Sequence, residues 1–247
     1  MRGDSARQTA KPLRVGAALP DPPFEFMGET GPLGFDVDLM RPVAEALGRT
    51  WKLVRFEGQD FAGIFAGLKT GLHDCVASGT TITPERAETA DFCEPYVMSG
   101  QSLVVDIGRH AQVRSTADLA GLTIGVQQGN TSGPVAERPA AKGHVGCVRH
   151  YAYHDIDAVL DDLSSGGCDA FMKLAPVTQW LVRDRPRLRV VATGITKELL
   201  GVCVRKGDTG LRAAIDEAQR RLRADGTLQR LVDRWLGDGA SVAGGAP

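Results

Sequence analysis

Hydroxyl side chains and one guanidinium gather in a single short polar run of this 247-residue chain. Ser78, Thr80 and Thr81 shortly precede Arg86, and Gly79 among them leaves its backbone N–H group accessible. These donors suit an anion, and a planar carboxylate best, because one guanidinium can bond both oxygens at once. The run therefore predicts a carboxylate-binding site.

The same run also has the pattern of a helix that begins at the surface. Thr83 suits the N-cap, Pro84 suits the first turn, and Glu85 in that turn suits the positive end of the helix dipole. A capped helix alone would bind nothing. The position of the run after a predicted strand favours a site, because ligands of α/β proteins lie outside the carboxyl ends of the strands.

One helix–strand unit occurs twice in the chain. "DFAGIFAGLKTGLHDCVASGTT" begins at Asp60, and "DIDAVLDDLSSGGCDAFMKLAP" begins at Asp155. In both, apolar residues recur at i, i+3, i+4 and i+7, which predicts an amphipathic helix capped by the Asp. Gly71 and Gly166 are expected to end these helices. The predicted strands that follow are residues 73–77 and 168–172.

The beginnings of the two halves agree with this repeat. "LRVGAALP" from Leu13 and "LTIGVQQG" from Leu122 are β-rich runs that break into a loop marked by Gly or Pro. Alternating strands and helices predict an α/β protein with two similar lobes and mainly parallel central sheets. A site is expected in the loops that follow residues 15–17, 76–77, 124–126 and 171–172.

The C-terminal region predicts two amphipathic helices interrupted at "ADGT". Their arginines alternate with acids, which indicates a solvated helix face rather than a nucleic-acid surface. Residues 1–10 and the tail, residues 238–247, are small and polar, and we expect both to be disordered.

Composition fits a globular protein of one or two domains, with 43% hydrophobic and 24% charged residues and a net charge of −1. No basic stripe indicates nucleic-acid binding, and no apolar run is long enough to span a membrane. The beginning of the sequence, "MRGDSARQTAKP", has no apolar signal-peptide core.

The five cysteines form no CxxC and have no nearby histidine partners, so neither a metal site nor any other cofactor is expected. Cys75 is expected in the core, and a disulfide between Cys147 and Cys168 is an open alternative. His73 and His154 are expected to be structural or surface groups, with His73 exposed. No G-x-S-x-G motif supports a serine hydrolase.

The chain from residue 13 to residue 237 resembles the extracytoplasmic solute-binding proteins of polar amino-acid ABC importers, solute-binding family 3. The motifs that carry the resemblance are, in order, "PPFEF", "GFDVDLM", "DFAGIFAGL", "SGTTITPERAETADFCEPY", "LAGLTIGVQQGNTS", "GGCDAFMKLAPV" and "LGVCVRKGD". The resemblance implies a bilobed periplasmic-binding-protein type II fold, with hinge strands near residues 95–100 and 197–202. It places lobe 1 at residues 11–97 plus 201–237, and lobe 2 at residues 99–199.

The resemblance also implies a function. A small carboxylate-bearing solute, an amino acid or a similar molecule, would bind between the lobes of a monomer outside the cytoplasm and be delivered to the membrane component of an ABC importer. Arg86 would clamp the carboxylate with residues 79–81 of one lobe and Asn130 and Thr131 of the other, and Phe61 would stack on the ligand. The full set of expected ligand-binding residues is Asp21, Phe24, Phe61, Ser78, Gly79, Thr80, Thr81, Arg86, Gln128, Asn130, Thr131, Lys173 and Leu174.

Two positions depart from the family pattern. Leu174 stands where the family has a carboxylate for the ligand's α-ammonium, with Lys173 beside it, and Asp21 replaces a cleft aromatic. An ammonium facing Leu174 would have no charged partner. Either Asp21 is a turn residue and the ligand lacks an amino group, or Asp21 is a relocated ammonium anchor. Fitting ligands are carboxylates without an α-amine, betaine-like or N-substituted zwitterions, or molecules whose cation reaches Asp21.

Two other functions stay open on the same fold. Resemblance to cyclohexadienyl (arogenate/prephenate) dehydratases would require a general acid, for which Asp21, Glu25 or Lys173 could be proposed. A ligand-sensing module would use the same closure to signal to another partner. Formation of phenylpyruvate from prephenate would identify the dehydratase.

Overall fold

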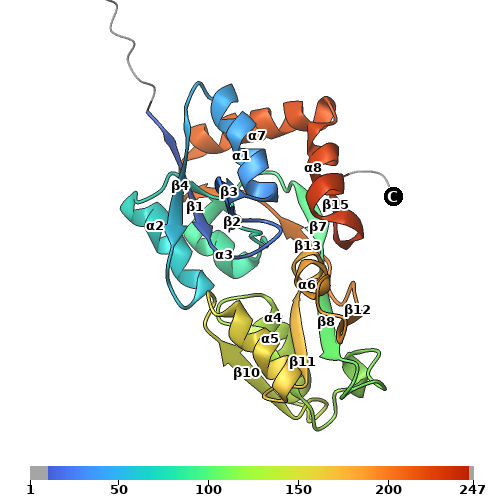
Figure 1. The fold of residues 1–247 in the computed structure, drawn as a ribbon. Coiled ribbons are helices and arrows are strands. Elements are labelled where there is room, and N and C mark those ends of the chain that lie inside the picture. The colour runs from blue at the N-terminus through green and yellow to red at the C-terminus, as the bar shows by residue number, and fades with distance from the viewer. Residues whose placement is uncertain (1–10, 245–247) are drawn as a thin grey trace, which may run out of the picture.

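The computed structural model describes residues 11–244 and divides them between two α/β lobes (Figure 1). In Figure 1 the upper, first lobe contains both the blue beginning and the red end of the chain, and the green and yellow middle forms the lower, second lobe. The predicted disorder of residues 1–10 and 245–247 concerns residues outside those described. Within residues 11–244, no helix has the length and apolar character needed to cross a membrane.

The first lobe is built on a five-stranded sheet in the order β4-β1-β5-β14-β6. β1 is parallel to β4 and β5, whereas β14 is antiparallel to both of its neighbours. The strands are β1 (Leu13–Ala18), β4 (Trp51–Phe56), β5 (Cys75–Val76), β6 (Ala90–Phe92) and β14 (Cys203–Arg205), with a separate hairpin of β2 (Phe26–Gly28) and β3 (Gly31–Leu33). The helices are α1 (Phe35–Ala46), η1 (Phe61–Gly63), α2 (Ile64–Thr70), α3 (Pro84–Thr89), α7 (Thr209–Ala224) and α8 (Thr227–Trp235).

The second lobe repeats this plan with the strand order β10-β9-β11-β8-β12. In each sheet only one strand, β14 or β8, runs against the other four. The strands are β8 (Gln101–Asp106), β9 (Thr123–Gln127), β10 (Cys147–Tyr151), β11 (Ala170–Leu174) and β12 (Leu188–Ala192), and the helices are η2 (Thr116–Asp118), α4 (Ser132–Ala140), α5 (Ile156–Ser165) and α6 (Ala175–Val182). The predicted α/β fold of two similar lobes with mainly parallel sheets is confirmed.

Two antiparallel strands lie between the lobes (Figure 1). β7 (Val97–Ser99) pairs with β13 (Glu198–Leu200), and both lie within the segments predicted as the hinge. The lobe boundaries near residues 97–99 and 199–201 stay a prediction.

The predicted disorder of the tail is wrong for residues 238–244. Here η3 (Gly237–Gly239) leads into β15 (Ser241–Val242), which pairs with β7. Ser99 donates its hydroxyl to the Gly239 carbonyl at 2.7 Å, and Ala243 is buried. Backbone pairing needs no large side chains, so the small polar composition gave no sign of it.

The repeated helices have the predicted buried faces but differ in their caps. Asp60 accepts a hydrogen bond from the Ala62 backbone N–H at 2.8 Å. Asp155 occupies the predicted N-cap position, but its side chain makes no cap hydrogen bond. Gly71 and Gly166 end their helices with φ of 74° and 100°, as predicted. Glycine takes this left-handed conformation without the strain of a Cβ atom.

The sequence-based alternatives for cysteine and histidine are corrected by the structure. Cys147 and Cys168 are both free thiols, because β9 lies between the strands that they begin or precede, so the open disulfide alternative is wrong. His73 is buried rather than exposed, and burial lowers its pKa. Its ring fits against Gly16 and Gly67, where a Cβ atom would approach within 2.8 Å and 2.2 Å of it. In residues 11–244, His, Cys, Asp and Glu form no cluster of three suited to a metal ion.

Candidate ligand-binding site

Side chains from both lobes line a narrow cavity between the lobes. Its walls come largely from the loops after β1, β5 and β9 and from the end of β11, where the sequence predicted a site. The expected ligand-binding residues that line it are Asp21, Phe61, Ser78, Gly79, Thr81, Arg86, Asn130, Thr131, Lys173 and Leu174. Three further lining residues were not predicted: Gln101, Ser132 and Tyr153.

The remaining expected residues, Phe24, Thr80 and Gln128, do not line the cavity. The ring of Phe24 lies beneath Gly79, where a Cβ atom would be 3.0 Å from it. Thr80 is buried, and its hydroxyl donates to the Ser78 carbonyl at 3.4 Å. Gln128 accepts a hydrogen bond from the Phe61 backbone N–H at 3.2 Å through its carbonyl. These three residues therefore support the residues that line the cavity without lining it themselves.

Arg86 is placed by the short helix α3. Thr83 caps this helix and accepts the Arg86 backbone N–H at 3.2 Å, as predicted. The guanidinium lies 5.0 Å above the ring of Phe61 and donates to the carbonyls of Thr81 at 2.9 Å and Gly129 at 3.0 Å. Burial lowers its pKa below the usual value of arginine, but arginine remains charged in proteins. Three of its five N–H groups stay available for a ligand.

The other predicted anion donors are already engaged. The Gly79 backbone N–H donates to Asp36 at 2.6 Å, and the Ser78 hydroxyl donates to Glu25. Thr81 likewise turns its hydroxyl hydrogen away, toward Glu198 at 2.7 Å. Of the predicted donors around Gly79, the hydroxyls of Ser78 and Thr81 and the Gly79 N–H are therefore taken up by buried acids that the sequence did not place nearby.

Two of these acids lie beneath the loop after β5, fully buried in the first lobe. Burial raises the pKa of Asp36 to about 7. Burial and the nearby Asp36 and Asp21 carboxylates raise the pKa of Glu25 well above its usual value. Neither acid lines the cavity, so their role is to hold the loop through Ser78 and Gly79.

The second lobe presents Lys173 to the cavity, and this lysine is already paired with Asp21 of the first lobe. Lys173 Nζ is 2.9 Å from Asp21 Oδ1 and donates to Gln127 Oε1 at 2.5 Å. The hydroxyl of Tyr153 donates to Asp21 Oδ2 at 2.9 Å. Asp21 also forms the predicted turn, because its carbonyl accepts the Phe24 N–H at 2.9 Å. Both of its side-chain oxygens are engaged, which argues against Asp21 as an ammonium anchor.

Glu198, on the strand β13 between the lobes, is a third buried acid that bonds residues of the lining and that the sequence did not indicate. It accepts hydrogen bonds from Thr81 and Thr131 at 2.7 Å each, from Gln101 at 2.9 Å and from Thr196 at 2.7 Å. Gln101 lies directly opposite Leu174 in the pairing of β8 and β11. That pairing joins distant segments, and no local pattern in the sequence indicates it.

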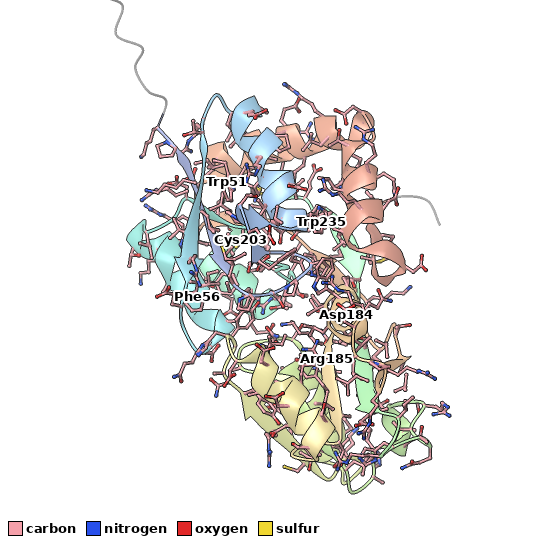
Figure 2. The ribbon with its side chains drawn as sticks, viewed as in Figure 1. Trp51, Phe56, Asp184, Arg185, Cys203 and Trp235 are labelled. Atoms are coloured by element: carbon pink, nitrogen blue, oxygen red, sulfur yellow. The ribbon has the colours of Figure 1, made fainter. Side chains whose placement is uncertain are left out.

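The lobes contact each other around the cavity. The rings of Phe61 and Tyr153 lie 5.0 Å apart at 31°, and the Tyr153 N–H donates to the Gln59 carbonyl at 2.6 Å. The ring of Trp180 of α6 lies 6.2 Å from the ring of Trp235. Trp235 is the last residue of α8 in the first lobe and is labelled in Figure 2. The structure therefore has the lobes closed on each other, with the guanidinium of Arg86 inside.

Fold and site together define a two-lobed binding protein with an interlobe cavity. The chain belongs to the bacterial extracellular solute-binding proteins, family 3, whose sequence profile matches residues 13–238. It is 30% identical over 228 residues to the L-cystine-binding protein TcyJ of Escherichia coli, covering 91% of this chain and 82% of that protein.

Solved structures of amino-acid-binding proteins have the same fold. An ancestral arginine-binding protein bound to arginine aligns with a TM-score of 0.84 and 33% identity, over 93% of this chain and 100% of that one. An ancestral amino acid-binding protein described as a precursor of cyclohexadienyl dehydratase aligns with a TM-score of 0.79 and 32% identity, over 91% of this chain and 95% of that one.

Proposed function

We propose that this protein binds a small carboxylate-bearing solute, an amino acid or an amino-acid-like molecule, between its lobes and delivers it to the membrane component of an ABC importer. The observation that carries the proposal is Arg86, a partly buried guanidinium that lines the interlobe cavity and keeps N–H groups for a ligand. A carboxylate suits it because the guanidinium fork matches both carboxylate oxygens. The names of relatives that bind cystine and arginine support the same ligand class.

Closure links binding to delivery. Arg86 belongs to the first lobe and bonds the Gly129 carbonyl of the second, so a ligand held by the guanidinium also meets the second lobe. A ligand stabilises the closed form only through contacts that the open form lacks. The closed pair of lobes is then the form that an importer recognises. We place this monomer outside the cytoplasm, in line with the extracellular description of its family.

A dehydratase is the weaker alternative for this cavity. Among the described residues, Asp21 is the one acid that lines it, and both its oxygens are engaged by Lys173 and Tyr153. A general acid needs a proton to give at the reacting atom, and Asp21 has no free position for one. Prephenate incubated with the protein should therefore yield no phenylpyruvate absorbance. A ligand-sensing module would use the same ligand site and would differ from an importer component only in the protein that it contacts.

The test begins with a thermal-shift screen over amino acids, 2-oxo acids, betaines and small dicarboxylates, because a ligand of the folded state raises the melting temperature. The best compound is then titrated calorimetrically into wild type, Arg86→Ala and the control Arg189→Ala, which changes an exposed arginine on β12. Arg86→Ala should weaken binding by at least a hundredfold, or about 2–5 kcal/mol, because it leaves a buried carboxylate unpaired. Unchanged affinity in Arg86→Ala would rule out the carboxylate clamp.

A further inference from the structure

Two charges at the cavity, on the partly buried Arg86 and the buried Glu198, have no ionic partner within residues 11–244. Arg86 bonds two backbone carbonyls but forms no ion pair with an acid. Glu198, which is 7% exposed, accepts four hydrogen bonds but forms no ion pair with a Lys, Arg or His. Buried charges are normally paired, since burying an uncompensated ion is costly. By contrast, the other two charges that line the cavity, Asp21 and Lys173, neutralise each other.

The hydrogen bonds of Glu198 determine what the cavity wall offers to a ligand. Thr81 and Thr131 both direct their hydroxyl hydrogens to Glu198, so they present oxygen lone pairs to the cavity that they line. Gln101 directs its amide N–H₂ to Glu198 and Thr131, which leaves its Oε1 free. This oxygen and the Ser132 hydroxyl are buried in the lining without a hydrogen-bond partner in the described structure. The wall is thus rich in acceptors backed by a negative charge.

We infer that the ligand is a zwitterion, with its carboxylate on Arg86 and a primary ammonium on the acceptor wall formed by Thr81, Gln101 and Ser132. Glu198 supplies the compensating negative charge one hydrogen bond behind that wall. An ammonium has three N–H donors and no acceptor, which matches three free oxygens better than a hydroxyl or carbonyl does. The inference rests on the proposed function and names the ligand class as amino acids with a free amine.

This assignment explains how the site functions with Leu174 in the second lobe. Leu174 lies opposite Gln101 in the strand register, and Gln101 connects this position to Glu198. The acid that compensates an ammonium thus comes from the hinge strand β13 and acts through hydroxyl and amide groups. Glu198 is therefore a positioning and charge-compensating residue rather than a direct contact.

The first experiment compares matched ligands on the wild-type protein. Each set has one side chain in four forms: the amino acid, the 2-hydroxy acid, the 2-oxo acid and the N-acetyl amino acid. Alanine, leucine, glutamate, arginine and phenylalanine supply the side chains. In the set that binds best, calorimetry should give the free amine at least a tenfold lower Kd than its three neutral analogues. A neutral analogue that equals or exceeds the amine overturns the zwitterion inference and leaves the proposed function standing. Failure of every compound to bind overturns both.

The second experiment assigns the effect to Glu198. Glu198→Gln keeps the shape and removes the charge, so the Kd of the preferred amino acid should rise at least tenfold while that of its 2-hydroxy analogue changes by less than threefold. Glu94→Gln, at an exposed glutamate near the hinge, is the matched control. Thr81→Val, which removes one oxygen of the wall, tests the same point if Glu198→Gln melts at a much lower temperature. Equal losses for amine and hydroxyl ligands in the folded variants would show a merely structural role and overturn the assignment.

Discussion

The ion pair between Asp21 and Lys173 joins the lobes inside the cavity, and its replacement tests the closed arrangement directly. The charged atoms are 2.9 Å apart, and the side chains are 6% and 3% exposed. At an effective dielectric constant of about 20, two unit charges at this distance attract each other by about 6 kcal/mol. Burying each ion costs several kcal/mol, so the intact pair contributes little net stability.

The single substitutions should therefore cost much more than the double one. Lys173→Met leaves the Asp21 carboxylate with only the hydroxyl of Tyr153. Asp21→Asn leaves the Lys173 ammonium with the amide oxygen of Gln127 and the ring of Tyr153 but no opposite charge. Each should lower the free energy of unfolding by about 3–5 kcal/mol, because one charge stays buried without its partner. The double variant Asp21→Asn/Lys173→Met should stay within about 2 kcal/mol of wild type.

Urea unfolding gives the measurement, with tryptophan fluorescence as the signal, because Trp180 and Trp235 lie against each other between the lobes. Lys69→Met, at an exposed position on α2, controls for the loss of a lysine. The diagnostic quantity is the coupling energy of the double-mutant cycle. If the two single effects simply add in the double variant, the side chains do not meet in solution, and the closed arrangement around them is refuted.

Two further predictions concern pH and closure. Because burial raises the pKa of Asp36 to about 7, the folded state holds a proton that the unfolded state loses near pH 4, and stability should fall between about pH 4 and 7. In urea unfolding, Asp36→Asn should reduce the loss of unfolding free energy between pH 5 and pH 8 by about 2–3 kcal/mol. If Asp36→Asn loses as much unfolding free energy between these pH values as wild type does, another titrating group causes the pH dependence. Gly129 and Gly121 have nearly the same positive φ, 76° and 74°. A Cβ atom added to Gly129 would lie 2.1 Å from Asp60 of the other lobe, whereas a Cβ atom added to Gly121 would have no heavy atom within 4 Å. Gly129→Ala should therefore raise the ligand Kd more than tenfold in calorimetry, and Gly121→Ala should not; equal effects would attribute the loss to backbone strain alone.

Much of the fold could be predicted from local patterns in the sequence. The repeated helix spacing and the terminal glycines Gly71 and Gly166 predicted two similar lobes, and the run from Thr83 to Arg86 predicted both a capped helix and its place at a strand end. These features depend on residues a few positions apart, so the sequence displays them directly. The strand β15 in the tail was not predicted, because it is held by backbone hydrogen bonds to β7 and not by a side-chain pattern.

The partners of the site residues could not be predicted in the same way. Asp21 departs from the family pattern in the sequence, but its pairing with Lys173 depends on how a loop of the first lobe meets strand β11 of the second. The hydroxyls of Ser78 and Thr81 were correctly placed at the cavity, but their hydrogens point to Glu25 and Glu198. Sequence identifies which groups can donate a hydrogen, whereas only the packed structure determines which acceptor takes it.

The position of Glu198 couples recognition to closure. It lies on the hinge strand β13 and is bonded by Thr81 of the first lobe and Thr131 of the second. Opening the lobes would separate these two donors, because one follows β5 in the first lobe and the other begins α4 in the second. The acceptor wall and its negative charge are therefore complete only when the lobes are closed. An ammonium that needs this wall gains its contacts only in the closed form, which is the differential contact that a ligand requires to shift the equilibrium. A ligand held by Arg86 alone would gain much less from closure.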